Sequence, residues 1–158
     1  MVSIDATGFE SWETLNRQAR ALLAGEHHRI ANAANLASLI FTTVPDLNWA
    51  GFYFVEAGEL VVGPFQGRPA CVRIAQGSGV CGTAMQTRRT QRVDDVAAFD
   101  GHIACDPASR SEIVVPLIAG DELIGVLDVD SPEPGRFSAR DQRGFEALAK
   151  TYIESLGG

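Results

Sequence analysis

Cys105 is the residue of this sequence whose surroundings most clearly indicate chemistry. It lies within Val96–Val115, where residues such as Asp106 and Pro107 break regular structure and predict a loop. A cysteine that serves only packing is usually buried in a core, so a loop cysteine with polar neighbours indicates a reactive thiol. Glu112 follows at the start of an apolar run, so this thiol and a carboxyl group could share one cleft.

Two further cysteines, Cys71 and Cys81, bring the count to three. An odd number does not describe the disulfide framework of a secreted domain and is more typical of redox or metal chemistry in a cytosolic protein. His102 with Cys71 and Cys81 matches no common zinc-site spacing, so we expect no metal. From context alone, a packing role stays open for Cys71 and especially for Cys81, at the start of a short predicted helix.

Two acidic side chains are predicted to share one face of a strand. Alternation along Leu123–Asp130 places Asp128 and Asp130 on the same side as two aliphatic residues. Trp49 and Tyr53 lie four residues apart on another predicted strand and therefore also share a face. These patterns indicate a cleft with acidic and aromatic walls, although turn or capping duty for the acids and core packing for the rings stay open.

The elements that would position these residues are helices at both ends of the chain and strands between them. Apolar spacing of three and four residues predicts the terminal helices, whereas alternation and turn residues predict antiparallel strands, which together give an α+β fold. The expected helices are 9–23, 26–41, 80–87 and one after Ser138, and the expected strands are 48–55, 59–64, 71–74, 91–93, 113–118 and 123–130.

Composition limits the function classes. With 158 residues, the chain is expected to form one domain, 1–158. A net charge of −7 argues against binding to nucleic acid or to an anionic membrane surface. The longest uncharged stretch, 30–44, is too short and polar to span a bilayer, and the first residues do not resemble a signal peptide. We therefore expect a small or neutral ligand, and none of these features suggests export.

Seven sequence blocks carry a specific resemblance over nearly the whole chain. In these blocks the chain is similar to the GAF-domain family of free methionine-R-sulfoxide reductases. That resemblance implies a single GAF domain with a six-stranded antiparallel sheet, helices packed on one face and the ligand pocket on the other. It also implies a cytoplasmic location and a homodimer. The blocks are 48–53 (NWAGFY), 63–67 (GPFQG), 70–74 (ACVRI), 79–84 (GVCGTA), 100–106 (DGHIACD), 111–117 (SEIVVPL) and 124–131 (IGVLDVDS).

The resemblance also assigns roles to the cysteines. Cys105 is the implied nucleophile, which attacks the sulfur of free L-methionine-(R)-sulfoxide and becomes a sulfenic acid. Cys71 is the implied resolving thiol, and Cys81 has an auxiliary or alternative resolving role. An external dithiol, thioredoxin, would restore the thiols, so no bound cofactor is expected in this repair of oxidised methionine.

The remaining implied site residues contact the substrate. A protonated carboxyl group must supply the proton that the sulfoxide oxygen needs, and Glu112 and Asp130 are the candidates, with acid and ammonium-binding duties undivided. Asp128 is a further expected substrate contact. The implied methyl pocket contains Trp49 and Tyr53, and loop amides at Ile103 and Ala104 would hold the substrate carboxylate.

Two other functions remain compatible with the sequence. A non-catalytic GAF domain could sense a small molecule, and a redox switch could form a disulfide without a substrate. Both would fail to release methionine from its sulfoxide in the presence of dithiothreitol, whereas a reductase would release it.

Overall fold

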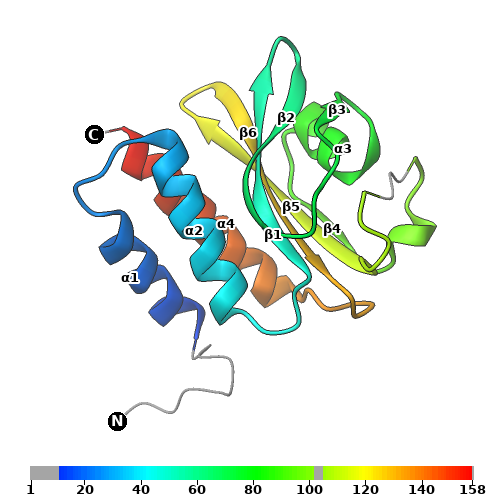
Figure 1. Ribbon diagram of the computed structural model, residues 1–158, viewed down its shortest axis with the longest axis horizontal. Helices are drawn as coiled ribbons and strands as arrows, with labels where there is room; N and C mark the ends of the chain where they lie inside the picture. The colour runs from blue at the N-terminus through cyan, green and yellow to red at the C-terminus, as the bar shows by residue number, and fades with distance from the viewer. Residues whose placement is uncertain (1–10, 102–104, 158) are drawn as a thin grey trace.

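The computed structural model describes residues 11–101 and 105–157. Its helices and strands follow one another along the chain in the order that the sequence predicts. Figure 1 shows the long helices lying together beside a curled sheet. The helices are α1 (Trp12–Leu23), α2 (Arg29–Thr43), α3 (Gly79–Thr87) and α4 (Ala139–Leu156), with a 3₁₀ turn at Val96–Ala98. The strands are β1 (Trp49–Glu56), β2 (Glu59–Gly67), β3 (Arg73–Ala75), β4 (Gln91–Val93), β5 (Ser111–Ala119) and β6 (Glu122–Ser131).

Side-chain caps define where two of the helices begin. The Ser11 side chain accepts a hydrogen bond from the Thr14 amide at the start of α1, and Ser138 forms a reciprocal capping box with Asp141 at the start of α4. Each cap satisfies an amide that has no partner within the helix. The expected start of the first helix, Phe9, lies outside the described residues.

The six strands form one antiparallel sheet in the order β3-β2-β1-β6-β5-β4, which confirms the predicted α+β class. Several strand boundaries differ from the prediction by one to three residues. β2 continues beyond Pro64 to Gly67, because it stays paired with β1 along its length. β3 begins at Arg73 rather than at Cys71, so this cysteine lies in the connection that precedes an edge strand.

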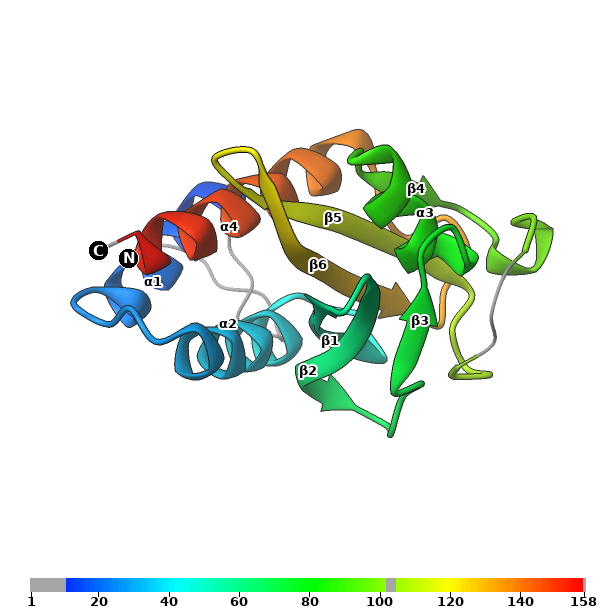
Figure 2. The ribbon, with the colours of Figure 1, turned by 90° about the horizontal axis from the view of Figure 1, so that it is seen from above.

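The two faces of the sheet have different coverings. α1, α2 and α4 lie on one face, where Phe52 and Phe54 of β1 and Leu127 and Val129 of β6 join their core. The opposite face carries α3 and a smaller apolar cluster, in which Tyr53 participates. Figure 2 shows α3 on the side of the sheet away from the long helices. Alternation within each strand therefore sends neighbouring residues to different environments.

Membrane insertion has no support among the described helices. None of those within 11–101 and 105–157 combines the length and apolar composition that a bilayer crossing requires.

Candidate active site

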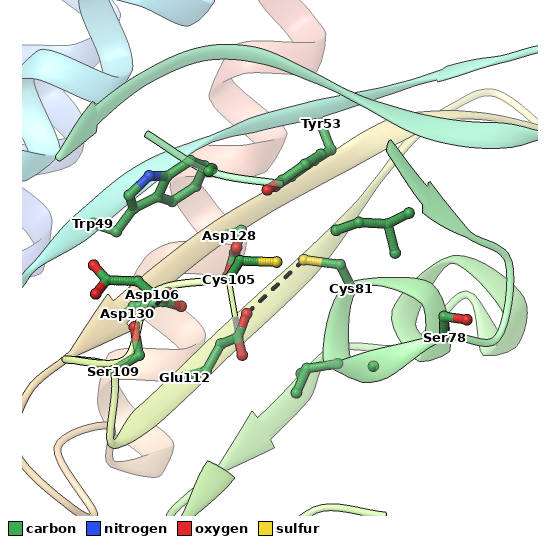
Figure 3. A pocket seen from close by; sticks show the side chains of 14 residues that line it. Trp49, Tyr53, Ser78, Cys81, Cys105, Asp106, Ser109, Glu112, Asp128 and Asp130 are labelled. Carbon is green, nitrogen blue, oxygen red and sulfur yellow. Dashed lines mark hydrogen bonds between the residues drawn. The ribbon is translucent and has the colours of Figure 1, made fainter. Parts of the chain in front are cut away.

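Three neighbouring strands place three predicted site residues in one row. Trp49 of β1 pairs with Asp130 of β6, which in turn pairs with Glu112 of β5. Directly paired residues of antiparallel strands project to the same face, so the three side chains emerge together on the α3 side. Asp128 lies two residues before Asp130 and therefore joins the same face. Figure 3 shows these side chains converging on one pocket.

Most of the predicted site residues line this pocket. Cys81 comes from α3, Cys105 comes from the loop before β5, and the rest come from the three central strands. The predicted residues that line it are Trp49, Tyr53, Cys81, Cys105, Glu112, Asp128 and Asp130. Cys71 is not part of the lining but is bonded to Cys105. Ile103 and Ala104 lie outside the described residues, as does His102.

The three carboxyl groups are buried. Glu112, Asp128 and Asp130 are at most 9% exposed. Loss of solvation raises the pKa of each above its ordinary value, and the charge of a neighbouring carboxyl group raises it further. Asp128 has this effect on Glu112, Asp130 has it on Asp128, and Glu112 has it on Asp130. One oxygen each of Asp128 and Asp130 is buried without a hydrogen-bond partner. The pocket therefore favours the protonated forms of these carboxyl groups, and the hydrogen-bonding capacity of Asp128 and Asp130 is only partly used.

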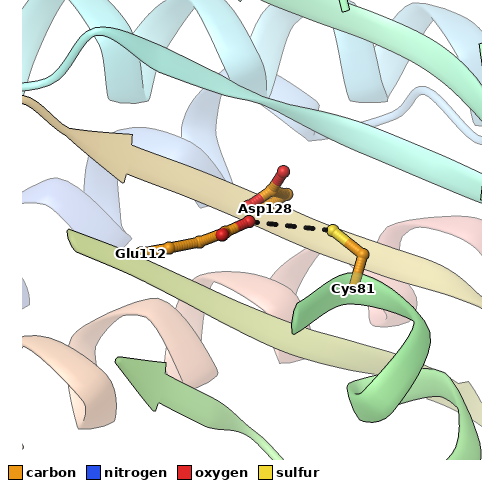
Figure 4. A group of neighbouring side chains, drawn as sticks. All are labelled: Cys81, Glu112 and Asp128. Atoms are coloured by element: carbon orange, nitrogen blue, oxygen red, sulfur yellow. Dashed lines mark hydrogen bonds between the residues drawn. The ribbon is translucent and has the colours of Figure 1, made fainter. Parts of the chain in front are cut away.

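Cys81 is a free, buried thiol beside these acids. Its Sγ lies 3.9 Å from Glu112 Oε2, and a dashed line marks this contact in Figures 3 and 4. Burial raises the pKa of the thiol, and the negative charge of Asp128 raises it further. Cys81, Glu112 and Asp128 offer ligand atoms within 4.8 Å of one another, a spacing that a divalent cation could use. The same burial favours their protonated forms, which do not bind a metal.

Cys71 and Cys105 form a disulfide with Cα atoms 5.4 Å apart. The bond links the segment before the edge strand β3 to the loop before β5. Because Cys71 is already bonded to another sulfur, it has no thiolate to offer a metal in this state. The pairing is the one that the resemblance implied, and it places a disulfide at the wall of the acidic pocket.

A polar network that sequence reasoning missed holds the Cys105 loop. Asn48 Nδ2 donates to Asp106 Oδ2 (2.9 Å) and to Ser109 Oγ (3.0 Å), and Ser109 Oγ donates to Asp130 Oδ2 (2.9 Å). Asp106 and Ser109 also line the pocket. The sequence marked Asp106 and Ser109 only as loop formers, because turn chemistry does not reveal which distant strand a loop contacts. The network connects the loop that carries Cys105 to the acidic strand β6.

The aromatic wall is also fixed by hydrogen bonds. The rings of Trp49 and Tyr53 stack with centroids 5.8 Å apart. Trp49 Nε1 donates to the carbonyl of Arg68, and the Tyr53 hydroxyl donates to the carbonyl of Cys71. Both bonds reach the segment between β2 and β3, so they hold the peptide that carries one half of the disulfide against the pocket.

Comparison with known proteins agrees with this geometry. Residues 31–152 match the GAF domain family. The chain is 52% identical over 139 residues to the free methionine-R-sulfoxide reductase of Escherichia coli, covering 88% of this chain and 84% of that protein. This chain belongs to the free methionine-R-sulfoxide reductase family of GAF domains.

Solved structures of this family have the same fold. The reduced form of the Staphylococcus aureus reductase is 48% identical with a TM-score of 0.91, and the match covers 99% of each chain. The Neisseria meningitidis free methionine-R-sulfoxide reductase, in complex with its substrate, is 38% identical with a TM-score of 0.90, covering 99% of this chain and 96% of that one. The family resemblance that the sequence blocks carried is thus confirmed.

Proposed function

We propose that this protein reduces free L-methionine-(R)-S-oxide to L-methionine with electrons from thiols. The observation that carries the proposal is the Cys71–Cys105 disulfide at the wall of a pocket lined by buried carboxyl groups. A sulfoxide reductase needs a thiol that accepts oxygen, a second thiol that closes a disulfide, and an acid near both. Cys105 and the carboxyl groups line the pocket, and Cys71 is bonded to Cys105 at its wall.

The first step transfers oxygen from the substrate to Cys105. Its thiolate attacks the sulfoxide sulfur, a proton is delivered to the sulfoxide oxygen, and methionine leaves as Cys105 becomes a sulfenic acid. The sulfur of the substrate gains the two electrons that Cys105 loses. Glu112 or Asp130 is the proton donor that we propose, because burial raises the pKa of each and favours the protonated form that can release a proton.

The second step closes the disulfide. The Cys71 thiol attacks the sulfenic acid of Cys105, forming the bond present in this structure and releasing water. Cys81 remains a free thiol in this state, which favours an auxiliary role. Contact with Glu112 gives it a positioning function for the carboxyl group.

The charge of the pocket fits a free amino acid. Among the described residues that line it, four carry carboxyl groups and none is Lys, Arg or His. The ammonium group of the substrate provides the positive charge that the carboxyl groups lack, and its approach favours their ionisation. We assign ammonium binding to Asp128 with Glu112 or Asp130, and the substrate methyl group to Trp49 and Tyr53. Ile103 and Ala104 remain our candidates for holding the carboxylate.

The remaining parts of the proposal concern the cellular setting. Thioredoxin returns the disulfide to two thiols, so the enzyme needs no bound cofactor, and the cytoplasm supplies that reductant. A homodimer is the assembly that we expect. Light scattering on the protein as it elutes from a size-exclusion column tests this assembly, and the mass of a monomer would contradict it.

The deciding experiment measures methionine release from the R and S epimers of free methionine sulfoxide with dithiothreitol. We expect turnover of the R epimer and loss of turnover in Cys105→Ser. Cys81→Ser keeps a hydrogen-bond donor beside Glu112 and should retain most of the turnover. Without reductant, Cys71→Ser should release one methionine per protein and leave a sulfenic acid that dimedone labels. Turnover that survives in Cys105→Ser would contradict the proposal, as would an inactive wild type.

A further inference from the structure

The two cysteines of the disulfide differ in their surroundings. Cys105 lines the pocket, and Asp106 and Ser109 close to it in the chain are buried. Cys71 is followed by two exposed residues, Val72 and Arg73, at the start of the edge strand β3. Both cysteines are themselves half-buried, so the difference lies in the residues beside them, which face the pocket at Cys105 and solvent at Cys71. The difference bears on how a protein reductant reaches the bond.

Val72 is an unusual surface residue. Its side chain is 59% exposed, the largest value among the strongly exposed large apolar side chains of the described residues. Its carbonyl accepts a hydrogen bond from the Val62 amide, so its backbone is held against β2 while the side chain remains in solvent. Ordered backbone beneath an exposed apolar group gives a partner a fixed contact point, with little ordering cost on binding.

β3 is also an edge of the sheet. It pairs with β2 on one side only, and alternate residues of such a strand direct their backbone groups away from the sheet. Exposed edges accept extended segments of other proteins through backbone hydrogen bonds. The cysteine that precedes this edge is therefore presented beside both an apolar side chain and a strand that can accept a partner.

Charge near Cys71 also suits an incoming thiolate. Arg68 and Arg73 lie exposed on either side of it, although the chain as a whole carries a net charge of −7. Arg73 forms an ion pair with Glu59 at 2.7 Å, whereas Arg68 has no acidic partner among the residues that the structure describes. Neighbouring cations stabilise thiolates, which are the species that attack a disulfide.

We propose that the edge formed by Arg68, Cys71, Val72 and Arg73 is the docking surface for a protein dithiol, and that the dithiol attacks Cys71 rather than Cys105. The partner is a small reductase of the thioredoxin type, whose reactive thiol lies within an apolar surface that covers Val72. This inference rests on the proposed function for its physiological meaning. Its chemistry needs only the disulfide that the structure contains.

The exchange balances as two thiol–disulfide steps. A thiolate of the partner attacks Cys71 Sγ, the Cys71–Cys105 bond breaks, and Cys105 leaves as a thiolate. The second thiolate of the partner then attacks the partner's own sulfur in the mixed disulfide and releases Cys71. The partner's two thiols lose two electrons and become a disulfide, while Cys71 and Cys105 gain them. Cys105, the proposed nucleophile, is thus regenerated in the first step.

Trapping identifies the sulfur that is attacked, and it requires no sulfoxide. The oxidised protein is mixed with thioredoxin in which the second active-site cysteine is replaced by serine, and the mixed disulfide is mapped by peptide mass spectrometry. We expect the link at Cys71. A link at Cys105 would overturn the inference, and so would a failure to form any link while dithiothreitol reduces the same disulfide.

Turnover with two reductants tests the docking surface. Val72→Asp should lower kcat/KM for thioredoxin roughly tenfold, because one buried apolar contact is lost, while turnover with dithiothreitol stays at the wild-type value. Val72→Thr, which keeps the shape, should give a smaller loss in the same direction. Leu22→Asp places the same charge at another exposed apolar position, on α1, and should change neither rate.

The outcomes separate this inference from the proposed function. Equal losses with both reductants in Val72→Asp and Val72→Thr would show a structural effect and overturn the docking surface, as would an unchanged rate with thioredoxin. An inactive wild type with both reductants would instead remove the proposed function, and the trapping experiment would still decide which sulfur the partner attacks.

Discussion

The two faces of the sheet use neighbouring residues of the same strands for opposite purposes. On β6, Leu127 and Val129 are fully buried in the core beneath α1, α2 and α4, whereas Asp128 and Asp130 are buried in the pocket on the other face. Burial is similar on both sides. The first pair gains free energy from leaving water, and the second pair loses solvation that only partners or ligands can replace.

The two faces therefore differ in what they contribute to the protein: one stabilises the fold and the other is suited to bind a ligand. The helix-covered face buries apolar side chains such as Phe52, Leu127 and Val129, and their removal from water stabilises the fold. The pocket face keeps buried carboxyl oxygens on Asp128 and Asp130 without partners. Unsatisfied buried groups cost stability and are retained where a ligand can satisfy them. The free energy gained by apolar burial on the helix-covered face offsets the cost of burying carboxyl groups on the pocket face.

The largest expected effect is on the pocket face. Asp130→Asn and Glu112→Gln should each be tested for kcat with the R sulfoxide and dithiothreitol. The one that removes the proton donor should lose about 10²–10⁴-fold in kcat, because an amide cannot release the required proton. The free energy of unfolding should hold or rise. If both variants kept kcat and changed only KM, both carboxyl groups would be binding groups and neither would be the acid.

The helix-covered face should show the reverse behaviour. Leu127→Ala removes a fully buried side chain and should lower the free energy of unfolding by about 2–5 kcal/mol, measured by urea denaturation. The kcat of the folded fraction should remain near the wild-type value. A large loss of kcat in protein that is fully folded would break the division of labour between the two faces.

A third test uses the pH dependence of stability. Burial raises the folded-state pKa of Asp128, so the folded protein keeps a proton that the unfolded chain has lost above pH ~4. Its contribution to stability is complete below pH ~4 and is lost as pH rises through the folded-state pKa. Asp128→Asn cannot ionise, so its free energy of unfolding should exceed that of wild type by about 1 kcal/mol or more near pH 7.

Measurement of both proteins from pH 4 to pH 8 checks this expectation. The two curves should converge at the acidic end and separate as pH rises. If the free energies of unfolding of the two proteins differed by the same amount at every pH, the raised pKa of Asp128 would be contradicted. It would also be contradicted if wild type gained stability relative to Asp128→Asn as pH rises.

The smallest expected effect concerns the loop network. Ser109→Ala removes the hydroxyl between Asn48 and Asp130 and should lower kcat/KM by less than about tenfold, since one hydrogen bond contributes roughly 1 kcal/mol. Ser38→Ala changes a half-buried serine on α2, within the helix layer, and serves as the control. Equal rates for Ser109→Ala and wild type would show that the loop is held without this bond.

The sequence predicted the elements and the shared faces well. Alternation placed Asp128 with Asp130 and Trp49 with Tyr53, and the Ser138 cap marked the start of the last helix, because these patterns depend on neighbours in the chain. Register between strands depends on distant residues. Alternation alone could not reveal that Glu112 lies opposite Asp130.

Loop contacts were the least predictable part of the site. Asn48, Asp106 and Ser109 are ordinary turn and strand-entry residues in the sequence, and their partnership arises only when β1, β6 and the Cys105 loop meet. The pairing of Cys71 with Cys105 came from family resemblance, since three cysteines allow several pairs. The position of Cys71 before β3 rather than within it followed from where pairing with β2 begins.

The Cys71–Cys105 bond also closes a ring in the polypeptide, with 34 residues of sequence separation that include β3, α3 and β4. A ring of this size removes conformational freedom from the unfolded chain worth about 4 kcal/mol in the chain-entropy description. If the bond forms and opens once in each catalytic cycle, the protein alternates between a cross-linked and a linear chain. Its melting temperature would then report how much of the population awaits reductant, and oxidant exposure would raise the melting temperature rather than lower it.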